Sequence, residues 1–167
     1  MVGRGYHIAL TREHAKRLFA MKDDENLRKF LDELRADREM KKGGRVLDLG
    51  TCWDPIHRCL TDGELDPNGG EFPLNTVVLG GKQLHRGDDY TAVLIRPDMT
   101  TFIDTALRDI DEEWFRQKFE NLPASYAAPR GTKPFIEVWL QIQNLRAFFE
   151  AASENLEAVV FTAKFDA

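Results

Sequence analysis

The sequence predicts an α+β domain in which several helices pack against a mixed or antiparallel sheet. Strand-like segments stand near the start, in the middle and at the end of the chain, at residues 6–10, 90–95 and 158–161. The segments between them carry apolar residues at helical spacing, without a regular strand–helix–strand repeat. A length of 167 residues matches one domain, so we expect residues 1–167 to form a single compact unit.

The N-terminal third is predicted to be a strand followed by helices. Residues 6–10 alternate in polarity and end at Thr11, whose hydroxyl is suited to capping the next helix. The helical spacing beyond it indicates two helices, or one with a break, and Gly43-Gly44 ends this region. Residues 46–49 are either a strand or the lead-in to a helix. The expected apolar positions are Leu18, Phe19, Met21, Leu27, Phe30, Leu31 and Leu34.

The middle of the chain is predicted to hold a short helix, a long loop and a core strand. Asp54-Pro55 begins a helical turn that reaches about Leu60, since proline is tolerated in a first turn. Glycines and prolines make 62–73 a loop. Residues 74–79 are apolar and close at Gly80-Gly81, and 90–95 has the composition of a buried strand.

The last third is predicted to contain three helices and a closing strand. Two helices are expected around 102–107 and 112–119, the second capped by Asp111, and a loop rich in proline follows. A long amphipathic helix then spans about 135–153, before a final strand at 158–161. The expected apolar face of this helix is Ile136, Trp139, Leu140, Ile142, Leu145, Phe148 and Phe149.

Composition and charge narrow the class of protein. The formal net charge of -5 argues against general nucleic-acid binding, which depends on basic surface. No apolar run approaches the ~20 residues of a membrane span, and the N-terminal residues lack the apolar stretch of a signal peptide. Cys52 and Cys59 lack a CxxC spacing and the four histidines are scattered. We therefore expect a cytoplasmic protein without a disulfide framework, metal site or cofactor.

One segment resembles a cofactor-binding motif. Residues 45–53 are similar to the first motif of S-adenosylmethionine-dependent methyltransferases, in which a strand ends in a glycine-rich turn under the cofactor. The resemblance stops after Gly50, because Cys52 and Trp53 stand where small residues let the backbone approach a ligand. Later strand–helix units of the required kind are also missing from the pattern, so a methyltransferase is the least favoured function.

A second resemblance covers nearly the whole chain. Its motifs are, in order, Gly5-Tyr6, Trp53-x-x-x-His57-x-x-Leu60-Thr61, Pro73-Leu74, Leu79-Gly80-Gly81, Pro97-Asp98, Ile103, Leu107, Trp114, Phe119, Leu140, Leu145 and Phe149. The order of these motifs is similar to that of the YfbM-like family of bacterial domains. The resemblance implies an α+β fold and a cytoplasmic bacterial protein, and it brings no established reaction or catalytic residues.

A polar cluster is expected in the helical segment 54–60. Asp54 lies three residues before His57 and four before Arg58, so the three side chains share one side of a turn. A histidine beside a carboxylate can move protons at neutral pH, which makes His57 and Asp54 candidate catalytic residues. We favour the alternative that Asp54 caps the helix and pairs with Arg58, while His57 makes a structural hydrogen bond beside Trp53.

The favoured class of function is a non-catalytic module that binds a protein partner. An acidic domain with loops at 62–73 and 124–134 and without a reaction motif fits this class. One version is an immunity-type protein that neutralises a toxin enzyme by covering its basic active-site surface. The residues expected to bind are Trp53, Arg58, Asp62, Glu64, Asp66 and Glu71.

The competing class is a small-molecule enzyme centred on Trp53, Asp54 and His57. An enzyme should place Trp53, His57 and a polar group from a distant segment around one cleft, whereas a binding module should hold these residues packed or capped. The apolar face of the long helix fits a dimer contact and core burial equally well. The sequence therefore leaves the oligomeric state open.

Overall fold

The structure is a computed structural model that describes residues 2–165. The predicted α+β class is confirmed, and each pair of neighbouring strands is antiparallel. In chain order the elements are β1 (Val2–Leu10), α1 (Arg12–Ala20), α2 (Asp24–Ala36), α3 (Arg38–Lys42), β2 (Val46–Gly50), α4 (Trp53–Leu60), η1 (Leu74–Thr76), β3 (Lys82–Arg86), β4 (Tyr90–Ile95), α5 (Pro97–Arg108), α6 (Glu112–Glu120), α7 (Thr132–Glu154) and β5 (Ala158–Phe165).

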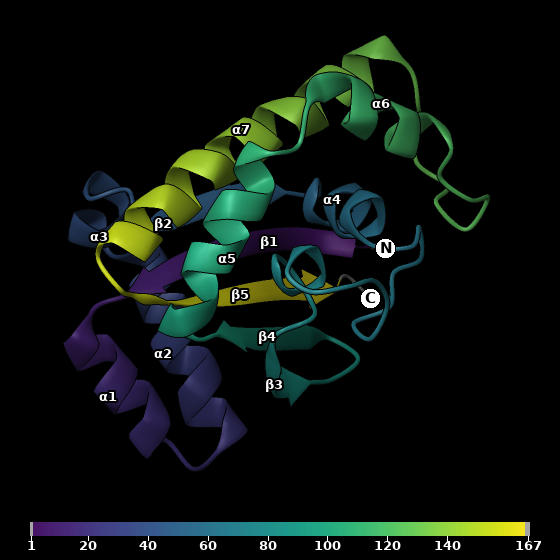
Figure 1. Ribbon diagram of the computed structural model, residues 1–167. Coiled ribbons are helices and arrows are strands. Elements are labelled where there is room, and N and C mark those ends of the chain that lie inside the picture. The colour runs from purple at the N-terminus through teal and green to yellow at the C-terminus, as the bar shows by residue number, and fades with distance from the viewer. Residues whose placement is uncertain (1, 166–167) are drawn as a thin grey trace.

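The sheet joins the first and last elements of the chain. Its strand order is β2-β1-β5-β4-β3, so β5 lies between β1 and β4 (Figure 1). This pairing places Phe161 opposite His7 on one side and Val93 on the other. The central strands β4 and β5 are buried on both faces, which explains why they are nearly continuous apolar runs in the sequence.

Helices cover both faces of the sheet (Figure 1). The residues Ile8, Leu94 and Val160 point toward the layer formed by α1, α2 and α3. The residues Val159 and Phe161 point toward the other layer, which contains α4, α5, α6 and α7. Successive side chains of a strand alternate between faces, so a single strand such as β5 supplies both cores.

Four helices begin at side-chain caps. Thr11, Asp23, Asp37 and Asp111 each accept a hydrogen bond from the backbone N–H three residues further on. The predicted caps Thr11 and Asp111 are therefore confirmed. Asp37 ends α2 and starts α3, so the helical region before Gly43 contains three helices where the pattern predicts at most two.

One strand is missing from the sequence-based prediction. β3 has the polar sequence Lys-Gln-Leu-His-Arg, and it lies at an edge of the sheet with β4 as its neighbour. An edge strand needs less apolar surface than a central one, so its sequence lacks the usual apolar pattern. The apolar run 74–79, by contrast, forms η1 and turns that bury Val77 and Val78.

Three expected core residues are exposed instead. Phe19 on α1 and the α7 residues Ile136 and Leu140 keep 64%, 57% and 55% of their accessible surface. The predicted apolar face of α7 is therefore too wide, because only the side with residues such as Ile142 and Leu145 packs against the rest of the domain.

Candidate functional site

Helix α4 carries the polar residues that the sequence analysis singled out. It follows β2 through a tight turn at Gly50, whose φ of +57° lies in the left-handed region that glycine adopts readily. All residues of α4 are buried, including Asp54, His57 and Arg58. Polar side chains enclosed in this way need partners within the protein.

Asp54 and Arg58 form an ion pair across one turn of α4. The Arg58 Nε donates to Asp54 Oδ1 at 2.6 Å, and the side chains are only 8% (Arg58) and 11% (Asp54) exposed. Arg58 Nη1 also donates to the carbonyl oxygen of Gly63 at 3.2 Å and to Ser125 Oγ at 3.0 Å. Ser125 Oγ in turn donates to a carboxylate oxygen of Glu64 at 3.0 Å. The guanidinium therefore links α4 to the loops that follow α4 and α6.

The His57 side chain holds the same loop by a hydrogen bond to the backbone of the loop. Its Nε2 lies 2.8 Å from the carbonyl oxygen of Asp66, and because a carbonyl only accepts, Nε2 carries the proton. Burial lowers the pKa of His57, so the ring is neutral at pH 7. Thr61 Oγ1 donates to the His57 carbonyl oxygen at 2.7 Å, which fastens the start of the loop.

Trp53 is a core residue. It is fully buried, its Nε1 donates to the Gly3 carbonyl oxygen at 2.9 Å, and its ring centroid lies 5.5 Å from that of Phe161. The expectation that Trp53 forms part of a binding surface is therefore corrected, because β1 and β5 cover the ring. A buried tryptophan stabilises a core when its indole N–H has a hydrogen-bond acceptor, as Trp53 has here.

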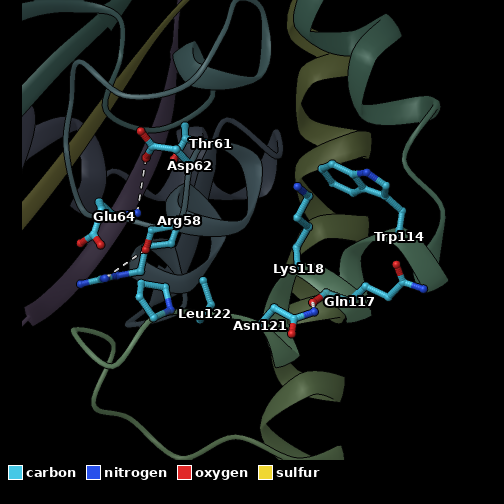
Figure 2. A pocket seen from close by; sticks show the side chains of 11 residues that line it. Arg58, Thr61, Asp62, Glu64, Trp114, Gln117, Lys118, Asn121 and Leu122 are labelled. Carbon is cyan, nitrogen blue, oxygen red and sulfur yellow. Dashed lines mark hydrogen bonds between the residues drawn. The ribbon is translucent and has the colours of Figure 1, made fainter.

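The loop after α4 and helix α6 form the two walls of a groove of about 540 Å³ (Figure 2). Asp62 and Glu64 lie on the loop wall, and Trp114 and Lys118 lie on α6. A second hollow of about 620 Å³ lies between the same loop and the start of α6, and Trp114 lines both.

All four loop carboxylates predicted as binding residues are exposed. Asp62 and Glu64 line the groove, and Glu71 lines the second hollow together with Asp62. Asp66 lines neither, and its Oδ1 accepts the backbone N–H of Asn68 at 2.9 Å. The structure therefore gathers three of the four around two hollows that share Asp62 and Trp114 as lining residues, with Arg58 at the base of the loop.

Exposed aromatic side chains lie in and beside the loop after α4, residues 61–73, which we call the acidic loop. Phe72 and Phe102 are 49% and 57% exposed and contact each other edge to face, with ring centroids 5.6 Å apart. Trp114 is 36% exposed, with Lys118 Nζ 5.4 Å from its ring centroid. This pairing could not be predicted from the sequence, because Phe72 and Phe102 come from a loop and a helix that only the fold brings together.

The geometry matches a packed, ion-paired arrangement better than a catalytic cleft. The expectation that Asp54 caps the helix is wrong, because α4 begins at Trp53 and its N-cap residue is Cys52, which makes no side-chain capping hydrogen bond. Neither Trp53 nor His57 lines the groove or the second hollow. Another hollow of about 720 Å³ is lined by Asp54, Arg58 and Ser125, whose polar groups are already paired with one another or with Glu64.

The cysteine thiols are also poor nucleophiles at neutral pH. Burial raises the pKa of Cys59 to about 12, and burial likewise raises the pKa of Cys52. A thiol acts as a nucleophile in its deprotonated form, so both groups are held in the unreactive form.

Residues 2–165 contain neither a cluster of metal ligands nor a membrane-spanning helix. Within that range no group of three or more His, Cys, Asp and Glu side chains is arranged to hold a metal ion. Over the same described residues, no helix has the length and apolar character needed to cross a membrane.

Comparisons with known proteins place the chain in a family. A family model described as a domain of unknown function, DUF1877, matches residues 1–162. No curated protein matches the sequence. The structure is similar to the crystal structure of YfbM, a protein of unknown function from Escherichia coli, with a TM-score of 0.68 and 20% identity over 98% of this chain and 99% of that one. This likeness confirms the YfbM-like fold expected from the motifs, and the chain belongs to the DUF1877 family of domains of unknown function.

Proposed function

We propose that this chain is a protein-binding module whose partner presents a basic surface. The contact surface is the acidic loop, residues 61–73, with its exposed carboxylates and the aromatic side chains beside it. One observation carries the proposal: the loop displays four carboxylates to solvent while buried side chains of α4 hold its backbone in place.

The buried contacts favour binding because they order the loop before a partner arrives. Arg58 bonds the Gly63 carbonyl and His57 bonds the Asp66 carbonyl, so the loop is fixed at two points. Ordering a mobile loop on binding costs conformational entropy, and a loop that is already ordered avoids most of that cost. The polar cluster of α4 therefore acts as a support for the surface above it.

The exposed aromatic side chains supply the apolar part of such a contact. Phe72 belongs to the acidic loop, Phe102 contacts it, and Phe72 and Trp114 line the second hollow. Aromatic residues are enriched among the few side chains that contribute most to binding energy, and a polar rim around them excludes water. Carboxylates next to aromatic side chains match this arrangement.

The immunity-type version of the proposal names the partner as a toxin enzyme with a basic active-site surface. Negative charge on the acidic loop would speed association with such a surface, and would position the module over it. The proposal places the protein in the cytoplasm, where reduced thiols such as those of Cys52 and Cys59 persist. The enzyme alternative has less support, because Trp53 and His57 face packed protein rather than a hollow.

The test compares capture by three immobilised proteins from an extract of the cells that make this chain. The first is the natural sequence. The second carries Asp62→Asn, Glu64→Gln, Asp66→Asn and Glu71→Gln, which remove the loop charges and keep hydrogen-bond acceptors. The third is a control with Glu13→Gln, Glu25→Gln, Glu33→Gln and Glu39→Gln, the same change in charge among exposed residues of α1, α2 and α3.

We expect a basic protein that the natural sequence and the control retain and the loop variant loses. With the identified protein purified, its association rate should fall at least about tenfold with the loop variant, and should fall for the natural sequence as salt is added. Equal retention by all three proteins, or an association rate insensitive to both salt and the loop substitutions, would refute the proposal.

A further inference from the structure

The outward face of α7 carries an uncharged stripe between two exposed carboxylates, Glu137 and Glu150. The inward face packs on α5 and the sheet, and Arg146 reaches back to donate to the carbonyl oxygens of Leu107 and Ile110. The outward positions form what we call the α7 stripe. Its exposed, uncharged members are Ile136, Leu140, Gln143, Asn144, Ala147 and Ala151.

The stripe differs from the other exposed positions of α7, which are mostly charged. Charged residues make up 31% of the chain, and the exposed side of a surface helix is where they normally gather. Instead, Ile136 and Leu140 lie four residues apart, on neighbouring turns of one face, and each is more than half exposed. Along the line of the stripe, charges return at its two ends, with Lys133 before it and Glu154 after it.

We propose that the α7 stripe binds a second copy of this chain, with the two α7 helices antiparallel about a two-fold axis. When the axis passes between positions 143 and 144, Leu140 faces the partner's Ala147 and Ile136 faces the partner's Ala151. Large side chains thus meet small ones, which lets two helices approach closely and interdigitate. Gln143 and Asn144 lie at the axis, where their amide groups can bond across it.

The charges agree with this register. Lys133 at one end of the stripe faces the partner's Glu154, so the contact ends in two opposite-charge pairs. In a parallel arrangement, Lys133 of one copy would instead lie beside the partner's Lys133, and the two like charges would repel. Glu137 and Glu150 flank the stripe on opposite sides, and a two-fold axis keeps each on its own side, about 20 Å from its counterpart. Like charges therefore do not meet in the antiparallel pair.

The proposed contact is small. One pair of helices buries less than the ~1,600 Å² of a standard protein–protein interface, so the dimer should exchange with monomer in the micromolar range. None of the stripe residues lines the groove or the second hollow beside the acidic loop. The proposal therefore stands independently of the proposed function and leaves that surface free in each copy.

The first test is the mass in solution by sedimentation equilibrium from about 1 µM to about 1 mM, which spans the expected dissociation constant. We expect the mass to rise from 19.1 kDa toward twice that value. Leu140→Glu should raise the dissociation constant at least tenfold. The matched control is Phe19→Glu, which places the same charge at a similarly exposed apolar position on α1 and should leave the dimer intact.

The second test is a charge exchange that checks the register. Lys133→Glu alone and Glu154→Lys alone should each weaken the dimer, because each places like charges at both ends of the contact. The double variant should restore the dissociation constant to within about threefold of the natural one. Neither substitution harms the helix itself, since a carboxylate near its N-terminus and an ammonium near its C-terminus both suit the helix dipole.

Three results would overturn the proposal. The natural sequence could stay at 19.1 kDa up to the highest concentration. A dimer could persist in Leu140→Glu with an unchanged dissociation constant, which would place the contact elsewhere. The double charge variant could remain as weak as the single ones, which would exclude the antiparallel register. Melting temperatures of all variants, measured beside the masses, show that each one is folded.

Discussion

Arg58 Nε lies 2.6 Å from Asp54 Oδ1 inside α4, and solvent reaches only about a tenth of either side chain. The pair is the centre of the hydrogen-bond network that supports the acidic loop, since Arg58 also donates to the Gly63 carbonyl oxygen and to Ser125 Oγ. Removing one member of an enclosed pair leaves the other charged and without a counter-charge, which is far more costly than removing an exposed pair.

Asp54→Ala should therefore lower the free energy of unfolding by about 3–5 kcal/mol. The measurement is urea unfolding at pH 7, followed by circular dichroism. Arg96→Ala is the control, because the Arg96–Asp98 pair is about 60% exposed and should contribute less than about 1 kcal/mol. If both substitutions cost the same, the α4 pair would not be the buried support that the structure indicates.

A second prediction concerns His7, which lies in the core of the sheet. The ring is fully buried, its Nε2 donates to the Val77 carbonyl oxygen at 2.7 Å, and it contacts the rings of Phe148, Phe149 and Phe161. Burial lowers the pKa of His7 from 6.5 to about 4. The native state therefore resists protonation of His7 that the unfolded chain accepts.

Stability should consequently fall as the pH drops from about 6.5 toward 4. Above pH 6.5 His7 is neutral in both states, whereas below it the unfolded state gains a proton first, and the shift from 6.5 to about 4 corresponds to about 3 kcal/mol. His57, whose pKa burial also lowers, acts in the same direction. The measurement is the free energy of unfolding in urea at several pH values between 7.5 and 4.5.

The control for this pH dependence is His7→Gln, which keeps a donor for Val77 and cannot titrate. The variant should be less stable at pH 7 and should lose less stability between pH 6.5 and 4.5. Identical slopes for the variant and the natural sequence would show that His7 does not carry the effect.

The third prediction concerns the contact between Gly5 and Trp53. A Cβ added at Gly5 would lie 2.5 Å from Trp53 Cδ1 and 2.9 Å from Phe161 Cε2, both parts of fully buried rings. Gly5→Ala should therefore destabilise the protein by about 1–3 kcal/mol or more through overpacking, measured as a drop in the free energy of unfolding.

Trp53→Phe provides the matching test, because a smaller ring makes room for the added methyl group. The double variant should lose less stability than the sum of the two single losses, as expected for side chains in direct contact. Strictly additive losses would mean that the β1 backbone and the Trp53 ring do not press on each other in the way described.

The local elements were predictable because their causes are local. Thr11 and Asp111 cap helices through their own side chains, and the apolar spacing of α2 and the continuous runs of β4 and β5 mark them directly in the sequence. β3 could not be predicted in this way, since an edge strand is specified by its neighbour β4 more than by its own residues.

The polar cluster was predictable in part for the same reason. The Asp54–Arg58 pair follows from four-residue spacing on one helix, so the sequence alone indicates it. The link from Arg58 to Ser125, 67 positions away, depends on how α4 and the loop after α6 meet. The enclosure of Trp53 between β1 and β5 likewise depends on strand order.

The sequence by itself therefore determined the α+β class, the positions of most helices and strands, and the acidic character of the loop after α4. Only the tertiary structure decided which apolar side chains remain outside. Ile136 and Leu140 on α7 have the same local pattern as their buried neighbours, and Phe72 and Phe102 meet only because the loop folds onto α5. Exposure depends on what the rest of the chain covers, and helical or strand periodicity carries no information about that.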